Sequence, residues 1–489
     1  RPRGGVHGRK LGGGRKPAAA AAGAEVAQQG DCMNIKIIGG TEMGEKFHFP
    51  EGLYADIRIE EKYTVNLMKF NGELVNDRAT QECGALIRVY DGKLWYTTST
   101  NELDRLQEEL DALAELAQPN PAIYDDPAIK LLEVNREERL RYEGDKLADI
   151  ARQRFMNVID YYAGACIEDE MPGVNSWSIG AGGEYSKLSF YSSKGSEIVY
   201  DYQMCAAGVW YTLGGNGEPM NCGKQIFGAV PEELTGHEAE ILAERARCVD
   251  YLANAVDVEP GEYTCVLSPI TTAMFAHESF GHKSEADFML NDKTLRDEWV
   301  LGKKVGSDLV SIVDSGDMQN HGYVPYDDEG TKARETWLIK NGVLTGRLHD
   351  SNSAAVLSEE LTGNCRAQSY RKRPIVRMTN TFLQPGKDSF EDIIADTKDG
   401  IYVHMVSDGT GGATFVMNAR VCYRIRDGKI CEPLRVHQLT GSVFQTLFDI
   451  DRVGSDFELF DSYTCGKMNQ IVRVSAGGPS IRVRKLHVN

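Results

Sequence analysis

The chain has 489 residues, 42% of them hydrophobic, which is enough for about two or three domains with sizeable cores. A net charge of −18, with no basic face carrying interleaved aromatics, argues against direct nucleic-acid binding, and no apolar run is long enough to span a bilayer. The 11 cysteines include no Cys-x-x-Cys pair, which is typical of reduced thiols in a cytoplasmic protein.

The first 32 residues differ in composition from the rest of the chain. They are basic, rich in Gly and Ala and low in complexity, so we expect a disordered segment. A vector-derived or upstream-translated extension and a transit-like leader both fit this composition. We place the start of the fold at Met33, with a first strand at 35–38, and an N-terminal α/β domain at 33–250.

The N-terminal domain is predicted to mix hairpins and helices. Two strand-like runs, 85–90 and 93–98, flank Asp91-Gly92, which is a strong hairpin signal. Leucines at 103, 106, 110 and 113 predict a helix whose apolar stripe faces the core. Prolines 119 and 121 indicate a linker, after which we predict a long helix over about 138–162. Strands at 187–191 and 197–200 and a helix at 238–254 complete this part.

A strand at 263–267 leads into a helix that begins at Ser268-Pro269, an N-cap followed by proline at the first helical position. We expect the helix to extend to about His282 and to bury Ile270, Met274 and Phe275. His277 and His282 are five residues apart, so a regular helix would point them about 140° apart. A single π-turn, tolerated at Gly281, would bring both imidazoles onto one face.

The remainder, 251–489, is predicted to be a strand-rich domain that carries this helix. Asn341-Gly342 and Asp427-Gly428 each lie between short apolar runs and predict two hairpins. Further strands are expected at 471–474 and 481–483, with Cys465 supplied by a loop near the end. The predicted fold class is therefore α+β, with an N-terminal α/β region followed by the strand-rich domain.

The His-Glu-Ser-Phe-Gly-His sequence and the distant Cys465 contain the groups of a hydrolytic metal site. Two imidazoles and a thiolate suit zinc, and three protein ligands with an open fourth position are typical of catalytic zinc. Glu278 would then be the base that takes a proton from the activated water. Iron or cobalt would accept the same ligands. Lys467, close to Cys465 in the sequence, is expected to help lower the pKa of the thiol.

Three other polar positions allow two interpretations each. Glu285 is either a hydrogen-bond acceptor for a metal-bound imidazole or part of a solvated acidic turn with Asp287. His321 either polarises a substrate carbonyl or is an exposed loop residue. The run Asp327, Asp328 and Glu329 lacks the alternating spacing of a calcium loop, so a structural turn is preferred over a cation site.

Five segments together resemble the signature sequences of one family. They are HESFGHKSEAD at 277–287, DDEGT at 327–331, RMTNT at 377–381, CGK at 465–467 and GGPSIRV at 477–483. From about Met33 to the C-terminus, the chain is similar to the TldD/PmbA family of zinc metallopeptidases. It departs from the family's usual pattern at Met468-Asn469, where an acidic residue and glycine normally precede the Gln.

The resemblance implies a TldD-like member, because TldE- or PmbA-like partners lack the metal motif. It implies one zinc ion per chain held by His277, His282 and Cys465, with Glu278 as catalytic base. It also implies a dimer, either with a second copy or with a TldE/PmbA-like subunit. The predicted function is a cytoplasmic zinc metalloendopeptidase acting on short or unfolded polypeptides, with no nucleic-acid or membrane partner. Two alternatives are a peptide-binding scaffold with a structural metal and a metal-dependent hydrolase of non-peptide amides.

Overall fold

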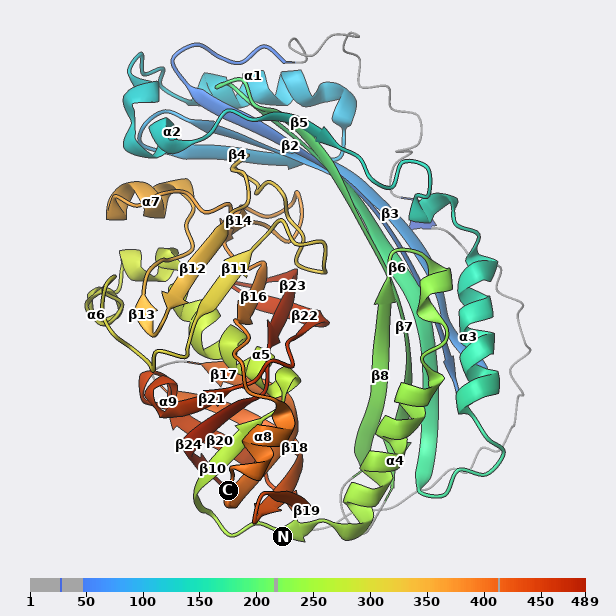
Figure 1. Cartoon of the computed structure of the whole chain (residues 1–489). Helices are drawn as coiled ribbons and strands as arrows, with labels where there is room; N and C mark the ends of the chain where they lie inside the picture. Colours follow the sequence, from blue (N-terminus) through green and yellow to red (C-terminus); the bar gives the residue numbers. More distant parts are fainter. Residues whose placement is uncertain (1–26, 29–46, 215–218, 412–413) are drawn as a thin grey trace, which may run out of the picture.

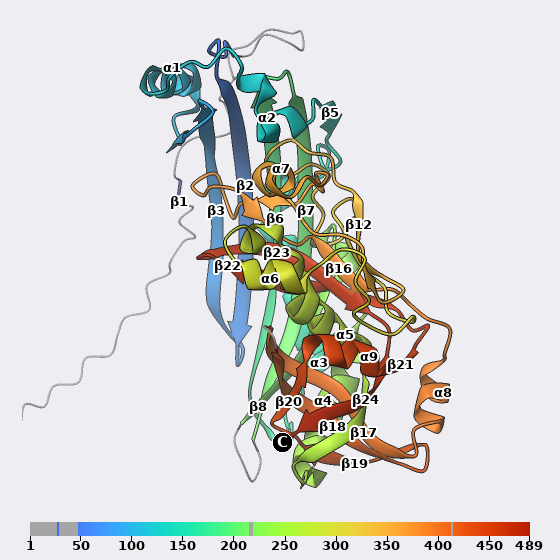
Figure 2. The ribbon, with the colours of Figure 1, turned by 90° about the vertical axis from the view of Figure 1, so that its left-hand side faces the viewer.

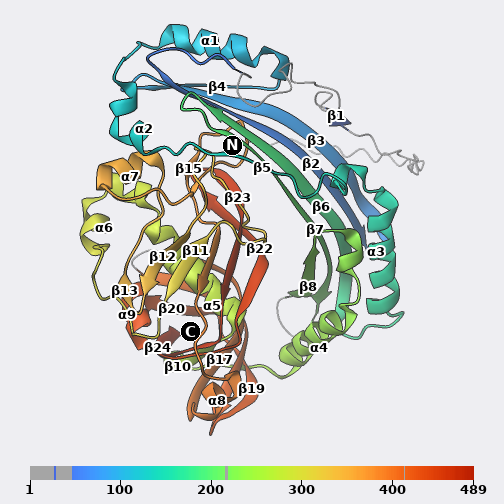
Figure 3. The same cartoon turned by 45° about the horizontal axis from the view of Figure 1, so that its top comes forward.

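The computed structural model describes residues 27–28, 47–214, 219–411 and 414–489. It has an α+β architecture in which a long, curved sheet from the first half of the chain wraps around a strand-rich second half (Figure 1). Seen from above, the second half lies inside the curve of that sheet (Figure 3). This confirms the predicted fold class. No helix in the described part of the chain is both long and apolar enough to cross a membrane.

The curved sheet has eight strands, and the strands at its centre are far longer than predicted. β2 and β6 pair in antiparallel fashion from Asp56 and Ser192 to Phe70 and Ser178. The main strand order is β1-β3-β2-β6-β7-β5, with β4 added beside β3 and β8 beside β7. The strands are β1 (Ala27–Gln28), β2 (Tyr54–Phe70), β3 (Glu73–Tyr90), β4 (Trp95–Thr100), β5 (Arg136–Arg139), β6 (Val174–Ser192), β7 (Glu197–Leu213) and β8 (Met220–Gly228).

Helices pack on the sheet at its apolar cores. The predicted leucine helix is confirmed as α1 (Leu106–Leu116), and the helix predicted at 238–254 is confirmed as α4 (Glu238–Asn254). α3 (Arg152–Cys166) packs on the convex face of the sheet, as Figure 1 shows, and α2 (Pro127–Leu131) is a short helix near its end. α4 also runs across residue 250, the predicted domain boundary, which stays a prediction.

The long helix predicted over 138–162 is wrong in its first half. The segment begins as β5, which pairs in parallel with β7, and α3 starts only at Arg152. The carboxylate of Asp201 accepts hydrogen bonds from the backbone N–H groups of Arg141 (2.7 Å) and Tyr142 (3.0 Å). A buried acceptor of this kind turns the chain away from a helix, so tertiary contacts override the helical pattern.

The second half contains two larger sheets and a small one. The eight-stranded sheet has the order β17-β10-β24-β20-β18-β19-β9, with β21 beside β24, and the six-stranded sheet has the order β13-β12-β11-β16-β23-β22. The strands are β9 (Val256–Asp257), β10 (Gly261–Leu267), β11 (Ile312–Ser315), β12 (Glu335–Lys340), β13 (Val343–Leu344), β14 (Cys365–Arg366), β15 (Ile375–Val376), β16 (Asn380–Leu383), β17 (Asp399–Gly411), β18 (Thr414–Arg426), β19 (Lys429–Arg435), β20 (Gln438–Ser442), β21 (Ile450–Val453), β22 (Glu458–Lys467), β23 (Gln470–Gly478) and β24 (Ile481–Val488).

The predicted hairpins of this half are confirmed. Asn341 and Gly342 turn between β12 and β13 with φ of 48° and 72°, and Asp427 and Gly428 turn between β18 and β19 with φ of 47° and 73°. The helices are short: α5 (Pro269–Ala276), α6 (Lys293–Glu298), α7 (Ser351–Leu357), α8 (Phe390–Ala395) and α9 (Val443–Asp449). One large apolar core fills the space between the two sheets and around α5.

The leader and first strand predicted from sequence fall largely outside the described residues. Residues 1–26 and the strand predicted at 35–38 are not described. Within the stretch expected to be disordered, Ala27–Gln28 forms β1 and pairs in parallel with Thr80 and Gln81 of β3. Figure 2 shows β1 beside the outer edge of the long strands.

Candidate metal centre

The predicted helix start and π-turn are both confirmed. Ser268 caps α5 by accepting a hydrogen bond from the backbone N–H of Thr271 (3.3 Å), and its own hydroxyl donates to the carbonyl of His404 (2.7 Å). α5 ends at Ala276, and residues His277–Gly281 form a single π-turn. Of the three apolar side chains expected to be buried, Phe275 is buried, whereas Ile270 and Met274 are only half-buried.

Close backbone packing surrounds the π-turn. A methyl group added at Gly281 would lie 1.9 Å from the sulfur of Met378, so no other residue fits without displacing that side chain. On the opposite strand β17, a methyl group at Gly411 would lie 1.9 Å from the carbonyl oxygen of Glu278. Both glycines therefore serve close approach of neighbouring segments.

The fold brings the two imidazoles and the thiol together. One ligand atom each from His277, His282 and Cys465 lies within 4.8 Å of the other two. Nε2 of His282 is 3.4 Å from Sγ of Cys465, and the imidazole rings are 5.3 Å apart between centroids, nearly perpendicular. Nδ1 of His277 is buried and has no hydrogen-bond partner in the described structure. The donor set consists of two imidazoles, one of which has a nitrogen without a partner, and a thiol. This set fits a zinc-type metal.

Cys465 reaches this site from a strand, not from a loop as predicted. It lies in β22, three residues before Met468 of the turn Met468-Asn469, whose φ angles of 49° and 56° close the β22–β23 hairpin. The carbonyl oxygen of Cys465 accepts a hydrogen bond from the buried guanidinium group of Arg377. The departure from the family pattern at Met468-Asn469 is thus a hairpin turn of the positive-φ kind.

The electrostatics of the three donors favour a thiolate. Burial alone would raise the pKa of the Cys465 thiol, but hydrogen bonds with His277 and His282 lower it to about 5. Burial would lower the pKa of His282, but its hydrogen bonds with Cys465 and Glu285 raise that pKa to about 10. Lys467, which we expected to lower the pKa of Cys465, instead donates to Asp287 (2.7 Å) and to the carbonyl of Val376 (2.9 Å). The prediction for Lys467 was wrong, because residues two apart on a strand share a face but need not touch.

Glu278 lies within the π-turn beside both imidazoles. It is half-buried, and burial raises the pKa of its carboxyl group, while His277 and His282 act in the opposite direction. Its carboxylate makes no hydrogen bond or ion pair with the described residues. The carboxylate is therefore free to accept a proton from a small molecule in the site.

Glu285 supports His282, which decides between the two interpretations left open by the sequence. Nδ1–H of His282 donates to Oε2 of the fully buried Glu285 at 2.9 Å. The ammonium group of Lys467 lies 3.4 Å from the same oxygen. Asp287 also accepts a hydrogen bond from Lys467. Glu285 and Asp287 therefore do not form a solvated acidic turn.

One residue of the site was missed by the sequence analysis. The ring of Tyr463 stacks on that of His277 with a centroid distance of 6.4 Å and an interplanar angle of 16°. Tyr463 precedes Cys465 by two residues on β22, so both side chains face α5. The alternation along a strand was the signal that could have revealed it, had Cys465 been assigned to a strand.

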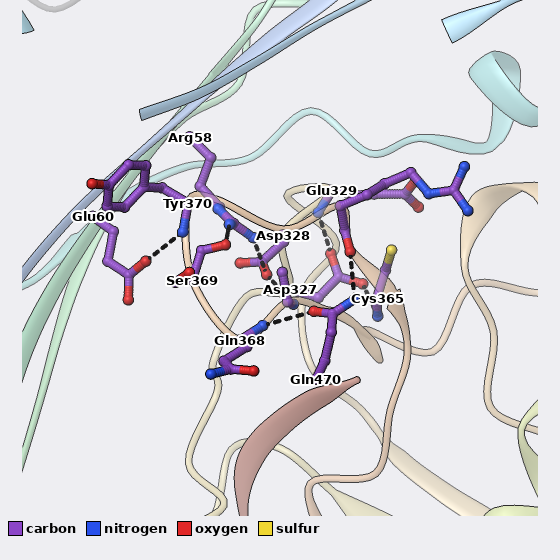
Figure 4. A network of polar contacts seen from close by, with 12 residues as sticks. Arg58, Glu60, Asp327, Asp328, Glu329, Cys365, Gln368, Ser369, Tyr370 and Gln470 are labelled. Atoms are coloured by element: carbon purple, nitrogen blue, oxygen red, sulfur yellow. Dashed lines mark hydrogen bonds and ion pairs between the residues drawn. The ribbon is translucent and has the colours of Figure 1, made fainter. Parts of the chain in front are cut away.

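The other two open positions are not part of the donor cluster. Asp327 accepts hydrogen bonds from three backbone N–H groups, those of Glu329, Thr331 and Cys365, which is the pattern of a structural turn. Asp328 and Glu329 pair with arginines of the curved sheet, as Figure 4 shows for Arg58 and Asp328. His321 is half-buried and does not belong to the donor cluster: its Nδ1 lies 2.7 Å from the hydroxyl of Tyr202 on β7.

Comparison with known proteins assigns this chain to a class. The family model described as "PmbA/TldA metallopeptidase C-terminal domain" matches residues 260–489. The model described as "PmbA/TldA metallopeptidase domain 1" matches residues 55–118. A metalloprotease of Methanothermobacter thermautotrophicus is 32% identical over 442 residues, covering 89% of this chain and 95% of that protein. A "Zinc metalloprotease TldD homolog" of Saccharolobus solfataricus is 31% identical, covering 65% of this chain and 72% of that protein.

Solved structures share the fold. TldE from Thermococcus kodakarensis superimposes with a TM-score of 0.69 at 15% identity, covering 89% of this chain and 96% of that one. A Thermotoga maritima protein gives a TM-score of 0.72 at 19% identity, covering 90% and 96%. The names of the matching family and relatives indicate that this chain is a metalloprotease. The chain belongs to the PmbA/TldA family of metallopeptidases, the TldD/PmbA family that its motifs resemble.

Proposed function

We propose that this protein is a zinc-dependent endopeptidase that cuts short or unfolded polypeptides, with one zinc ion held by His277, His282 and Cys465. The observation that carries the proposal is the convergence of these donors within 4.8 Å of one another, next to the partner-free carboxylate of Glu278. Among the described residues, no further His, Cys, Asp or Glu joins the cluster. Three protein ligands favour a catalytic ion over a structural one, which usually has four.

Bound zinc would supply Lewis acidity toward a peptide carbonyl and toward an attacking water molecule. Glu278 acts as the general base and accepts the proton of that water on its carboxylate. Glu285 holds the ring of His282 through Nδ1, which leaves Nε2 on the side of Cys465. The thiolate of Cys465 lowers the net charge of the site relative to three neutral imidazoles, so the carboxylate base matters more here.

An exposed sheet edge beside the donors suits an extended peptide. β22, which carries Cys465, is the last strand of the six-stranded sheet and pairs only with β23 among the described strands. Figure 1 shows β22 at the side of the second half that faces the curved sheet. A substrate strand added to this edge would bind through backbone hydrogen bonds and with modest sequence preference. An unfolded chain offers such a strand far more readily than a folded protein, whose backbone groups are mostly paired already, which is why we propose unfolded substrates.

We further propose that the protein works as a dimer, with a second copy or with a TldE/PmbA-like subunit. The structural likeness to TldE supports this assembly. Light scattering of the purified chain, alone and mixed with a co-expressed TldE-like protein of the same organism, measures which form exists.

The deciding experiment compares Glu278→Gln with the unchanged chain. We expect the variant to keep its zinc, measured by elemental analysis at one ion per chain, and to cut a reduced, alkylated test protein at least about 100-fold more slowly. Glu262→Gln is the matched control, because Glu262 is an exposed glutamate of β10, and it should cleave at the normal rate. Full activity of Glu278→Gln would remove the proposed base.

A second pair of assays separates the alternatives. Loss of cleavage on chelation and its return with zinc support a catalytic ion, whereas an inactive, zinc-loaded chain that still binds peptides would be a scaffold. Profiling on peptide and non-peptide amides tests the bond type, and preference for the non-peptide amides would assign another hydrolase. Equal cutting of a folded protein and its unfolded form would contradict the proposed substrate class.

A further inference from the structure

A cavity of about 650 Å³ lies between the curved sheet and the second half of the chain. Such a volume is typical of sites for small molecules or short peptides. Thr464 and Arg473, which pair across the β22–β23 hairpin, line this cavity. Val472, which pairs with Cys465, also borders the cavity, but none of the three metal donors lines it. The cavity is therefore a neighbour of the metal centre and does not include its donors.

Two arginines in the cavity wall carry charges without a counter-ion. The guanidinium group of Arg366 is buried and donates to two carbonyl oxygens, those of Met378 and Arg473 (2.9 Å). The guanidinium group of Arg473 donates to the carbonyl oxygens of His321 (2.7 Å) and Tyr323 (2.8 Å). Neither forms an ion pair with a carboxylate of the described residues. Burial and the nearby Arg473 lower the pKa of Arg366 to about 10.

Tyr202 fixes the position of one of these arginines. The guanidinium carbon of Arg473 lies 3.5 Å from the centroid of the Tyr202 ring, and the Tyr202 hydroxyl contacts His321. Burial, followed by Arg473 and Arg366, lowers the pKa of His321 to about 3, so this ring is neutral and adds no positive charge. The positive charge facing the cavity thus comes from two oriented guanidinium groups.

The acidic side chains of the wall already have partners. Figure 4 shows Asp328 bound by Arg58, and Glu60 beside Tyr370, whose backbone N–H donates to it at 2.7 Å. Burial raises the pKa of Glu60, which further reduces negative charge. The remaining two acids of the wall form ion pairs: Glu184 with Lys62 (2.6 Å) and Glu82 with Arg371 (3.0 Å). The charge left over is positive and is located at Arg366 and Arg473.

We propose that this cavity binds the carboxylate group of a short peptide through Arg366 and Arg473. Guanidinium groups bind carboxylates with short, charge-assisted hydrogen bonds, and burial strengthens such a pair. The peptide as ligand rests on the proposed function, because peptides are what this enzyme would bind and release. The cavity then holds either the C-terminal carboxylate of a substrate or product, or an acidic side chain, against the hairpin that carries Cys465.

Calorimetric titration of the full chain tests the proposal, in the Glu278→Gln background so that peptides are not consumed. The probes are trialanine, trialanine amide, an amidated and acetylated Ala-Glu-Ala, and inorganic phosphate. We expect trialanine to bind about tenfold or more tightly than its amide, and tight binding of the Ala-Glu-Ala probe would assign the site to acidic side chains instead. Equal affinity for trialanine and its amide, with no binding of Ala-Glu-Ala, would overturn the proposal, as would phosphate binding as tightly as trialanine.

Variants connect the preference to the two arginines. Arg473→Gln should abolish the difference between acid and amide, and Arg473→Lys should restore part of it. Arg371→Gln removes a paired, half-exposed arginine from the same wall and should change affinity less than about twofold. Retention of the preference in Arg473→Gln would contradict the assignment. If that variant fails to fold, the comparison of acid with amide in the parent chain still decides. A chain that binds trialanine but never cleaves a peptide would contradict the proposed function and leave this inference standing.

Discussion

His282 and Glu285 are joined by a 2.9 Å hydrogen bond from Nδ1–H to Oε2, one turn apart at the end of the metal-motif helix. The bond fixes the tautomer of the imidazole and directs Nε2 toward Cys465, 3.4 Å away. Glu285 is itself fully buried and lies 3.4 Å from the ammonium group of Lys467. The geometry of one donor is therefore set by a charge network that does not touch the other two.

Replacing Glu285 should weaken metal binding without removing a donor. Glu285→Gln keeps the shape but loses the charge that orients His282, and partners of this kind are worth about 10- to 100-fold in metal affinity. Competition with a chelating dye measures the change. Asp287→Asn is the control, because Asp287 contacts the same Lys467 but not the imidazole, and it should change affinity less than about threefold. Unchanged zinc affinity in Glu285→Gln would contradict this role.

Arg58 and Asp328 tie the curved sheet to the second half of the chain. Both side chains are almost fully buried, at 4% and 8% exposed, so Asp328→Ala leaves the buried guanidinium group of Arg58 without its carboxylate. We expect a loss of about 3–5 kcal/mol in unfolding free energy, and the double variant Arg58→Met with Asp328→Ala should lose less than the sum of the singles. Urea denaturation measures both. Glu82→Ala breaks a half-exposed pair with Arg371 and should cost less than about 1 kcal/mol. Equal costs for the buried and exposed pairs would exclude a buried link.

Glu329 makes stability depend on pH. Burial raises the pKa of its carboxyl group to about 7, although Arg88 acts in the opposite direction. Between an unfolded pKa of 4.5 and this value, the folded chain holds a proton that the unfolded chain has released, so folding is favoured at low pH. The contribution, on the order of 3 kcal/mol, is complete below 4.5 and lost as pH rises through 7. Glu329→Gln should flatten the urea midpoint between pH 5 and 8, and an unchanged slope would contradict the raised pKa.

Local sequence signals predicted the features that depend on neighbouring residues. The Ser268-Pro269 start and the spacing of His277 and His282 were enough to predict a π-turn, because both follow from helix geometry. The hairpins at Asn341 and Asp427 were found through their turn residues in the same way. Features that depend on distant segments were found only in part: donor chemistry and the family resemblance grouped Cys465 with the imidazoles, but the local sequence did not show that strand β22 brings it to a ring 183 residues away.

The lengths of β6 and β7 were missed for a related reason. Glycines at 180, 182 and 183 indicate a break in a strand when only the local sequence is considered. In the fold, a methyl group at Gly182 would lie 2.2 Å from the carbonyl oxygen of Val65, so the glycine allows β2 to pass close by. Tyr463 was missed and the role of Lys467 was misjudged, because their contacts depend on which face of β22 meets α5.

Gly281 should be essential for the shape of the metal site. A methyl group there would lie 1.9 Å from the sulfur of Met378, so Gly281→Ala must move either that side chain or the π-turn that holds His277. We expect Gly281→Ala to lower zinc affinity about tenfold or more and to lower the thermal midpoint, because overpacking of a dense core costs about 1–3 kcal/mol. Gly466→Ala is the control, since it adjoins Cys465 but meets nothing within 4 Å. Shortening Met378 to Ala in the Gly281→Ala background should restore part of the zinc affinity. If Gly281→Ala binds zinc as tightly as Gly466→Ala does, the close approach to Met378 does not shape the site.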